Sequence, residues 1–212
     1  MLNGIEVLCH SSIRIGRKKI IYFDPFNVKK NFNDADVIFV THDHYDHYDE
    51  ESIDKVKKRN TKIIIPVSLL EKAEKKFSKE DIITVEPNKN YEVLGIKFET
   101  IRAYNNEKNF HPKDKNWVGY LVNIDDVKYY IMGDTDDTLD ARKVKCDVAF
   151  VPIGGIYTMN KEEAVEYINY IKPLVAVPIH YGMVSGTNDD AEYFLDNIDE
   201  QVIGRILIDP NY

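Results

Sequence analysis

Three histidines and three aspartates lie within nine residues of this chain, directly after the apolar run 37–40. That run is rich in β-branched residues and predicts a buried strand, which would carry the polar cluster at its carboxyl end. Residues two apart in an extended segment point the same way, so His42 and His44 can close on one cation. Asp46 and His47 are adjacent and diverge, which favours a second ion. Imidazole and carboxylate together suit zinc, manganese or iron.

A solvated turn that caps a helix is the alternative interpretation of this cluster. Asp49 precedes Glu50 and Glu51, which is the pattern of a helix N-terminus. Such a cap requires one aspartate and gives the three imidazoles no role. The sequence therefore favours metal ligation.

Further ligands must come from elsewhere in the chain, because a single loop would hold a metal ion weakly. The chain has six histidines, and the other three are His10, His111 and His180. His180 follows the apolar run 175–179, and Asp134 follows another apolar run and a glycine, so both are placed at the ends of buried strands. A carboxylate at such a position can bridge two cations. The alternatives are a hydrogen-bonded core histidine for His180 and an Asx-turn residue for Asp134.

Length and composition limit the class of protein. With 212 residues, of which 43% are apolar and 30% charged, the chain fits one globular domain over residues 1–212. The net charge of -8 disfavours general binding of nucleic acids. No apolar run has the length of a membrane span and no secretory signal follows Met1, so we expect a cytoplasmic protein without a membrane partner.

The two cysteines, Cys9 and Cys146, are expected to be free thiols. Cys9 precedes His10, which raises the alternative of a nucleophile beside its base. Neighbouring side chains of a strand face opposite ways, so the sequence disfavours that pair.

The elements that position these residues follow one pattern twice. Short strands come first, and an alternation of strands and helices follows, which predicts two packed sheets with helices outside. A polar stretch over 104–116 is too long for a hairpin turn and is expected to be functional or disordered. Strands are predicted at 5–9, 13–15, 20–23, 37–40, 62–65, 91–94, 96–101, 119–124, 127–132, 147–152, 175–178 and 206–208, and helices at 50–58, 69–77 (capped by Ser68), 161–172 (after Asn160) and 191–198.

The motif set resembles the metallo-β-lactamase fold superfamily along essentially the whole chain. Within it, the sequence is similar to the branch of ascorbate-phosphate lactonase-like and N-acylphosphatidylethanolamine phospholipase D-like hydrolases. The resemblance implies an α+β fold, a four-layer αββα sandwich with a dinuclear site at one edge of the sheets. The matching segments are His42-Asp43-His44-Tyr45-Asp46-His47 (an HxHxDH motif), Gly133-Asp134-Thr135, Pro178-Ile179-His180-Tyr181-Gly182, His10-Ser11-Ser12 and Asp24-Pro25-Phe26.

The resemblance also implies a role for each ligand. His42 and His44 would hold the first ion, Asp46, His47 and His180 the second, and Asp134 would bridge the two.

The sequence departs from the family at one position. The family's third histidine for the first ion is expected where this chain has Asn105, in Ala103-Tyr104-Asn105. His111 lies six residues further on and is the candidate to replace it. Either His111 or Asn105 completes the first site. If neither does, the first site is under-liganded and the protein could hold one metal ion only. His111 would then be free to face the substrate.

These residues point to a metal-dependent hydrolase with two divalent ions, zinc first and manganese or iron as alternatives. A metal-bound hydroxide would attack a small lactone, ester or phosphodiester. Asp46 would orient it, and a ligand-bound water or Asp134 would pass a proton to the leaving group. His10 would hydrogen-bond substrate or a ligand, with a plain structural role as the alternative.

The alternatives are a nuclease of the same superfamily, a redox diiron protein and a non-catalytic metal-binding module. The expected partner is a small-molecule substrate, and self-association into a homo-oligomer stays open.

Overall fold

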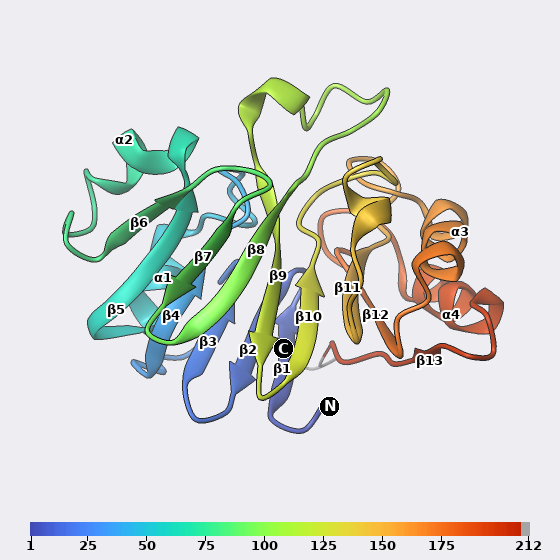
Figure 1. Ribbon diagram of the computed structural model, residues 1–212, viewed down its shortest axis with the longest axis horizontal. Helices are drawn as coiled ribbons and strands as arrows, with labels where there is room; N and C mark the ends of the chain where they lie inside the picture. The colour runs from blue at the N-terminus through green and yellow to red at the C-terminus, as the bar shows by residue number, and fades with distance from the viewer. Residues whose placement is uncertain (209–212) are drawn as a thin grey trace. The chain divides into compact units, whose positions relative to one another are not determined.

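The chain contains two mixed sheets, each belonging to one of two compact units. The computed structural model describes residues 1–208. The N-terminal unit comprises Leu2–Glu86 and 207–208, and the C-terminal unit comprises Met1 and Pro87–Ile206. In Figure 1 the first sheet runs from blue to green and the second from green to red. The expectation of one domain over residues 1–212 stays a prediction.

The N-terminal unit contains a six-stranded sheet in the order β1-β2-β3-β4-β5-β6. The first three strands form an antiparallel meander, and β3 to β6 are parallel. Parallel neighbours need a crossover, which α1 provides between β4 and β5. The elements are β1 (Ile5–Cys9), β2 (Ser12–Gly16), β3 (Ile20–Phe23), β4 (Ala35–Phe39), α1 (Glu50–Val56), β5 (Lys57–Pro66), α2 (Leu70–Ala73) and β6 (Ile82–Val85).

The hydrophobic core of this unit packs around β4 and so determines where the following loop begins. Ile38 and Val40 are fully buried and belong to one cluster with Ile53 and Val56 of α1. Burial of each such side chain contributes about 1.5–3 kcal/mol. Asp49 caps α1, since its side chain accepts a hydrogen bond from the backbone N–H of Glu51 at 3.1 Å. The loop 41–49, which carries the candidate ligands His42, His44, Asp46 and His47, thus lies between a buried strand and a capped helix, as predicted.

The predicted helix over 69–77 is shorter than expected, and the prediction that Ser68 caps it is wrong. Ser68 lies inside a 3-10 turn, Val67–Leu69, and α2 continues only to Ala73. Pro66 holds the preceding backbone extended, so the chain turns directly after it. The spacing of the apolar residues still has a structural basis, because Leu69, Ala73 and Phe77 are all buried in the core cluster.

The C-terminal unit contains a seven-stranded sheet in the order β13-β12-β11-β10-β9-β8-β7. Strands β7 to β10 are antiparallel and β10 to β13 parallel, which repeats the arrangement of the first sheet. The elements are β7 (Asn90–Val93), β8 (Ile96–Arg102), β9 (Val118–Ile124), β10 (Val127–Ile131), β11 (Val148–Pro152), α3 (Lys161–Ile171), β12 (Val175–Ile179), α4 (Asn188–Asn197) and β13 (Ile203–Gly204), with 3-10 turns at Lys113–Lys115 and Ala141–Lys143.

Capping boxes set the start of both long helices. Asn160 and Glu163 exchange side-chain-to-backbone hydrogen bonds at the N-terminus of α3, as the sequence predicted for Asn160. Thr187 and Asp190 do the same for α4, which therefore begins at Asn188, three residues before the predicted start.

The predicted closing strand at 206–208 is wrong. The strand that pairs with β12 is Ile203–Gly204, and Ile208 forms only an isolated bridge with Val7. Backbone bonds from Ile203 to Leu174 and from Arg205 to Ala176 set the register of this edge. Both segments are apolar, so the hydrophobic pattern alone did not identify the one that pairs.

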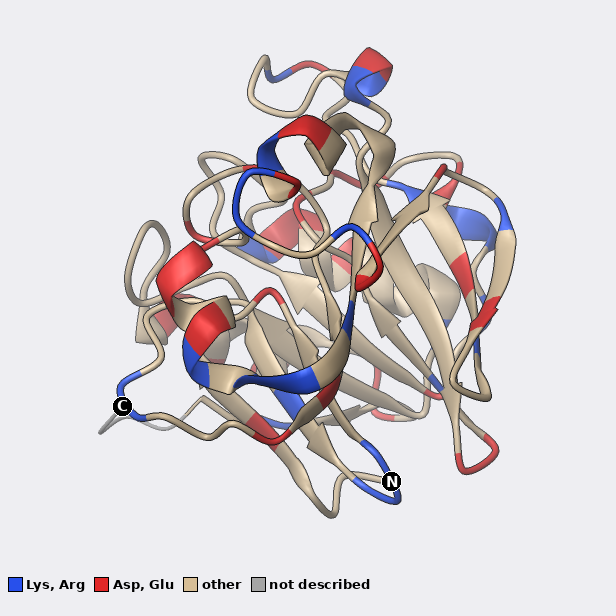
Figure 2. Ribbon diagram, turned by 90° about the vertical axis from the view of Figure 1, so that its left-hand side faces the viewer, with Lys and Arg blue, Asp and Glu red and all other residues tan. Residues whose placement is uncertain are grey.

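Basic and acidic positions are both scattered over the ribbon (Figure 2). Many are joined in ion pairs, such as Arg14 with Glu6 at 2.6 Å and with Asp34 at 2.7 Å. Pairs that are largely exposed, such as Lys75 with Glu71 at 3.2 Å, each contribute about 0–1 kcal/mol. Within residues 1–208, no helix combines the length and hydropathy needed to cross a membrane.

Candidate metal centre

The loop after β4 folds back on itself and gathers its histidines. The backbone N–H groups of His47 and Tyr48 both donate to the carbonyl of His44, at 3.0 and 2.8 Å. His42 Nε2 lies 3.2 Å from His44 Nδ1. Two donors at about 2.0–2.1 Å from a tetrahedral zinc ion lie about 3.3 Å apart. The His42–His44 pair therefore has the spacing of two ligands of one ion.

Asp24 is a residue that the sequence analysis did not assign, and it orients two of these histidines. Its side chain is completely buried and lies 2.7 Å from His47 Nδ1. It also accepts from the backbone N–H and the hydroxyl of Thr41, at 2.8 and 2.7 Å. Thr41 Oγ1 in turn lies 3.0 Å from His42 Nδ1. The Thr41 hydroxyl donates its proton to Asp24, so it accepts a hydrogen bond from His42 Nδ1. His47 Nδ1 donates to Asp24 in the same way. The imidazoles of His42 and His47 therefore both carry the proton on Nδ1 and present Nε2 for ligation.

The protonation state of Asp24 follows from these contacts. Complete burial raises the pKa of the Asp24 carboxyl above its usual range, and the His47 and Thr41 contacts offset this rise only in part. Three donors face its two oxygens, and an ionised carboxylate satisfies all three. We therefore assign Asp24 as the carboxylate that fixes the tautomer of His47.

Changing Asp24 to asparagine should weaken metal binding without unfolding the protein. The amide keeps the size of the side chain but carries no charge and accepts through one oxygen only, so the orientation of His47 and Thr41 is lost in part. We expect metal affinity to fall about 10–100-fold. A chelator-competition titration measures this. Asp34→Asn, which changes a carboxylate paired with Arg14 elsewhere in the unit, is the matched control, and equal affinities for the two variants would contradict the role of Asp24.

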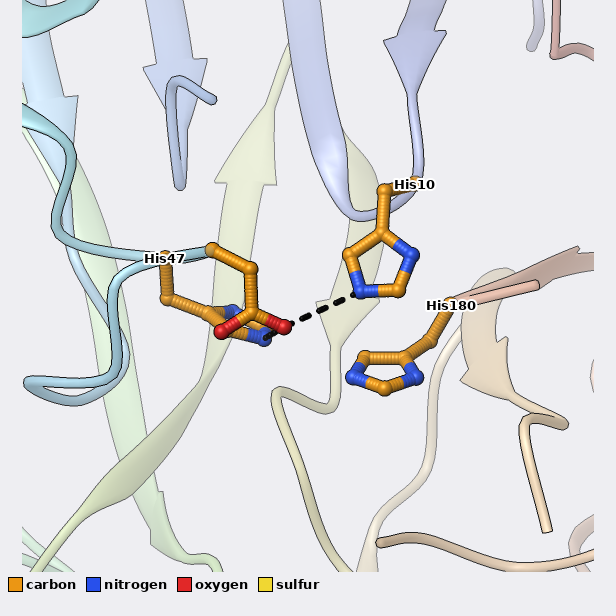
Figure 3. Close-up of side chains that lie close together, drawn as sticks. His10, His47 and His180 are labelled. Atoms are coloured by element: carbon orange, nitrogen blue, oxygen red, sulfur yellow. Dashed lines mark hydrogen bonds and ion pairs between the residues drawn. The ribbon is translucent and has the colours of Figure 1, made fainter. Parts of the chain in front are cut away.

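His10 and Asp46 form a second group in the N-terminal unit. His10 Nε2 lies 3.2 Å from Asp46 Oδ2, and His47 Nε2 lies 3.8 Å from the same oxygen. All three residues are buried, and each offers a donor atom within 4.8 Å of the others. Figure 3 shows the His10 and His47 imidazoles, and its dashed line marks an interaction at His10. The sequence analysis gave His10 a hydrogen-bonding role, and its geometry adds it to the candidate ligands.

Cys9 and His10 do not form a catalytic pair. The Cys9 thiol donates to the carbonyl of Phe26 at 3.2 Å, whereas His10 contacts Asp46. Burial raises the pKa of Cys9 to about 11, so the thiol stays protonated at neutral pH. The two side chains thus have different partners, as expected for neighbours on a strand.

In the C-terminal unit, two imidazoles converge on one carboxylate oxygen. Asp134 follows β10, and its Oδ2 lies 3.2 Å from His111 Nε2 and 2.9 Å from His180 Nε2. All three side chains are at most 3% exposed. Such distances suit a carboxylate that shares cations with both histidines. His111 is the residue of the long loop that contacts Asp134, while the Asn105 amide bonds to Asp136 and to the carbonyl of Tyr157.

The absence of a side chain at Gly154 leaves the space that His180 occupies. A Cβ atom at position 154 would lie 2.6 Å from the carbonyl oxygen of His180 and 2.8 Å from its Nδ1. Both distances are shorter than side-chain carbons adopt, so only glycine fits here. His180 itself has a positive φ of 59°, which turns the chain at the end of β12.

The lysines of the long loop are engaged within the protein. Lys108 Nζ lies 3.0 Å from Asp136 and donates to the carbonyl of Thr158 at 2.6 Å. Lys113 Nζ lies 4.5 Å from the centre of the Tyr104 ring. Both cations have partners within the protein, so neither is an obvious site for a phosphate or carboxylate.

Aromatic side chains flank the ligand segments in each unit. Tyr45 is 66% exposed and packs edge-on against Phe26 at 5.9 Å between ring centres. Phe110 and Tyr157 pack edge-on at 4.7 Å beside His111. Tyr181, which directly follows His180, is buried.

The donor set of each unit fits a divalent ion. The N-terminal unit supplies imidazoles and the carboxylate of Asp46, and the C-terminal unit supplies two imidazoles around Asp134. The contacts within each unit fall between 2.9 and 3.8 Å. Buried imidazoles with their Nδ1 atoms held by acceptors are the usual ligands of zinc and related metals.

Comparison with known proteins agrees with this chemistry. Residues 5–180 match the family model described as the beta-lactamase superfamily domain. The UPF0173 metal-dependent hydrolase of Pyrococcus horikoshii is 31% identical over 207 residues, which cover 90% of this chain and 89% of that protein. A crystal structure of a Parabacteroides distasonis protein is similar with a TM-score of 0.80, 26% identity and coverage of 96% of this chain and 91% of that one. The structure of Igni18, a metallo hydrolase from Ignicoccus hospitalis, shares the fold with a TM-score of 0.75, 20% identity and coverage of 96% and 94%.

The extent of the family match decides the assignment, because it includes both units and all seven candidate ligands from His42 to His180. It confirms the predicted α+β metallo-β-lactamase fold and the predicted metal dependence. The chain belongs to the metallo-β-lactamase superfamily and, within it, to the UPF0173 metal-dependent hydrolases.

Proposed function

We propose that the protein hydrolyses a small lactone or ester with two divalent ions held jointly by side chains of both units. The observation that carries the proposal is the convergence of His111 and His180 on one oxygen of Asp134. A carboxylate so placed is suited to bridge two ions. The proposed ligands are His42, His44 and His111 for the first ion, Asp46, His47 and His180 for the second, and Asp134 for both, with His10 beside Asp46.

Neither unit has a complete centre by itself. The His42–His44 pair needs a third imidazole, and His180 with Asp134 needs further ligands to reach four. The family model treats 5–180 as one domain, which supports the joining of the two sets.

The bound ions would lower the pKa of water from about 15.7 toward about 7 and polarise the substrate's carbonyl or phosphoryl oxygen. The side chains of this chain would do the rest. Asp46 would orient the attacking water through the oxygen that it does not use for ligation. Asp134 would hold a proton on its way to the leaving group. Asp24 would keep Nε2 of His47 and His42 directed at the ligand positions. Zinc is proposed first, with manganese or iron as alternatives.

Two observations favour an uncharged lactone or ester over a phosphate monoester. Lys108 and Lys113 have partners within the protein, and the exposed Tyr45 offers an apolar face beside the loop that carries His42. Phosphodiesters carry one negative charge and stay within the proposal as a second choice. The resemblance to the ascorbate-phosphate lactonase-like branch supports a lactone but does not favour an uncharged one. A cytoplasmic location, a small-molecule partner and self-association stay predictions.

An assay with defined metals tests this function. Metal-free protein would be reconstituted separately with zinc, manganese and iron(II), and then offered a γ-lactone, 4-nitrophenyl acetate and bis(4-nitrophenyl) phosphate. We expect metal-dependent turnover of the lactone or ester that His44→Ala abolishes. Tyr170→Phe, on the exposed face of α3, is the control variant.

The same assay separates the alternatives. Turnover of RNA or DNA in preference to the small substrates would replace the proposal with a nuclease. Stoichiometric metal without turnover of any substrate would identify a metal-binding module.

A further inference from the structure

The side-chain amide of Asn105 is bonded on every side. Its NH2 group donates to Asp136 Oδ1 at 3.0 Å and to the carbonyl of Tyr157 at 2.9 Å. Both partners are acceptors, which fixes the orientation of the amide. Its oxygen therefore faces His111 and lies 3.0 Å from both the backbone nitrogen and Nδ1 of that residue. Asn105 is 7% exposed, so these bonds form in a largely dry environment.

This geometry determines which nitrogen of His111 carries a proton. Nδ1 faces two oxygens that can only accept, the Asn105 amide oxygen at 3.0 Å and the carbonyl of Tyr157 at 3.2 Å. Nδ1 must therefore donate. Nε2 is then directed at Asp134 Oδ2, 3.2 Å away. An imidazole with Nδ1 protonated and Nε2 beside a carboxylate has the form of a metal ligand.

The segment between the two residues is fixed as a closed loop. The backbone N–H of Asn105 donates to the carbonyl of His111 at 2.9 Å, so the loop is joined at its base. Lys108, in its middle, contacts Asp136 and the carbonyl of Thr158. The backbone N–H of Asn106 donates to Asp136 Oδ2 at 2.9 Å. Asp136 thus accepts from three points of the loop, and His111 has a fixed support.

We propose that Asn105 is a positioning residue that holds His111 as the Nδ1-protonated tautomer and presents its Nε2 to the metal beside Asp134. This rests on the proposed dinuclear function, and it explains how the chain keeps a third imidazole although an amide stands at position 105. His111 supplies the ligand, and Asn105 supplies its orientation.

Two variants of Asn105 distinguish an effect on the His111 tautomer from an effect on folding. Asn105→Leu keeps the volume and removes both the acceptor and the donors. Asn105→Asp keeps an acceptor for His111 Nδ1 but replaces the donors to Asp136 with a second carboxylate, so it lowers stability more than it alters the tautomer. Asn106→Leu is the matched control, because it makes the same substitution one residue along at an exposed side chain.

The measurement is the ¹⁵N spectrum of the histidine side chains in metal-free and zinc-loaded protein, with His111→Gln to assign the signal. We expect Nδ1 of His111 to be protonated in the wild type and in Asn105→Asp, and to lose that signature in part in Asn105→Leu. Zinc titration should show the affinity of one ion lowered about 10–100-fold in Asn105→Leu and unchanged in Asn106→Leu.

The outcomes of this experiment are distinct. Two results would overturn the inference and leave the hydrolase proposal standing. The first is an unprotonated Nδ1 of His111 in the wild type. The second is an Asn105→Leu protein with the same ¹⁵N spectrum and zinc affinity as Asn106→Leu. If Asn105→Leu does not fold, loss of the Nδ1 signature in Asn105→Asp overturns it instead. A wild-type protein with the expected spectrum that binds no zinc removes the proposed function and the metal part of the inference together.

Discussion

Asp134→Ala should yield a folded protein that retains little metal and no measurable turnover. Asp134 is the carboxylate on which His111 and His180 converge, so its removal takes a ligand from both ions. Without the ions, water keeps a pKa of about 15.7 instead of about 7, and the nucleophile is lost at neutral pH. Strand β10, which ends three residues before Asp134, keeps its pairing with β9 and β11, so the fold should persist.

Metal analysis after dialysis and circular dichroism of the same sample test this expectation. Asp137→Ala is the matched control, because Asp137 lies three residues further on and pairs with Arg142 at the surface. We expect the control to keep the wild-type metal content. Full metal content or full turnover in Asp134→Ala would rule out a bridging role for this carboxylate.

Removal of the metal should lower the melting temperature substantially. A ligand at 1,000 times its dissociation constant stabilises the folded state by about 4.1 kcal/mol. For a chain of this length, 1 kcal/mol corresponds to about 2–4 °C, so each tightly bound ion should add about 8–16 °C. Thermal unfolding with and without chelator, followed by re-addition of zinc, measures the effect.

The comparison variant for this measurement is His44→Ala, which lacks one proposed ligand of the first ion. We expect zinc to stabilise it less than it stabilises the wild type. Identical melting curves of the wild type with and without chelator would show that the ions contribute nothing to stability.

Three of the proposed ligands were easy to locate in the sequence because each follows a buried strand. His42, Asp134 and His180 come after strongly apolar runs, and the hydrophobic pattern located β4, β10 and β12 within one or two residues. The predicted metal loop and the cap of α1 at Asp49 lie as expected. The short helix α2 and the last strand were less predictable, because their apolar residues fit more than one local structure.

Asp24 and Asn105 show what the sequence could not supply. Asp24 bonds to Thr41, 17 positions away, and Asn105 bonds to Asp136, 31 positions away. The spacing of residues along a helix or strand does not predict partners so distant in the sequence. Two signals were present: Asp24 follows an apolar strand and precedes a proline, and the resemblance to the superfamily led us to expect a histidine at the position of Asn105. Only the structure shows that Asp24 contacts His47 and that Asn105 contacts His111.

The central claim is that ligands from both units hold one pair of cations. Anomalous scattering from zinc-grown crystals, collected on both sides of the zinc edge, tests it most directly. We expect two peaks about 3.5–4 Å apart, with His42 and His44 at one, His47 and His180 at the other and Asp134 between them. A peak held by residues of one unit alone, or the absence of zinc from all seven proposed ligands, would contradict it.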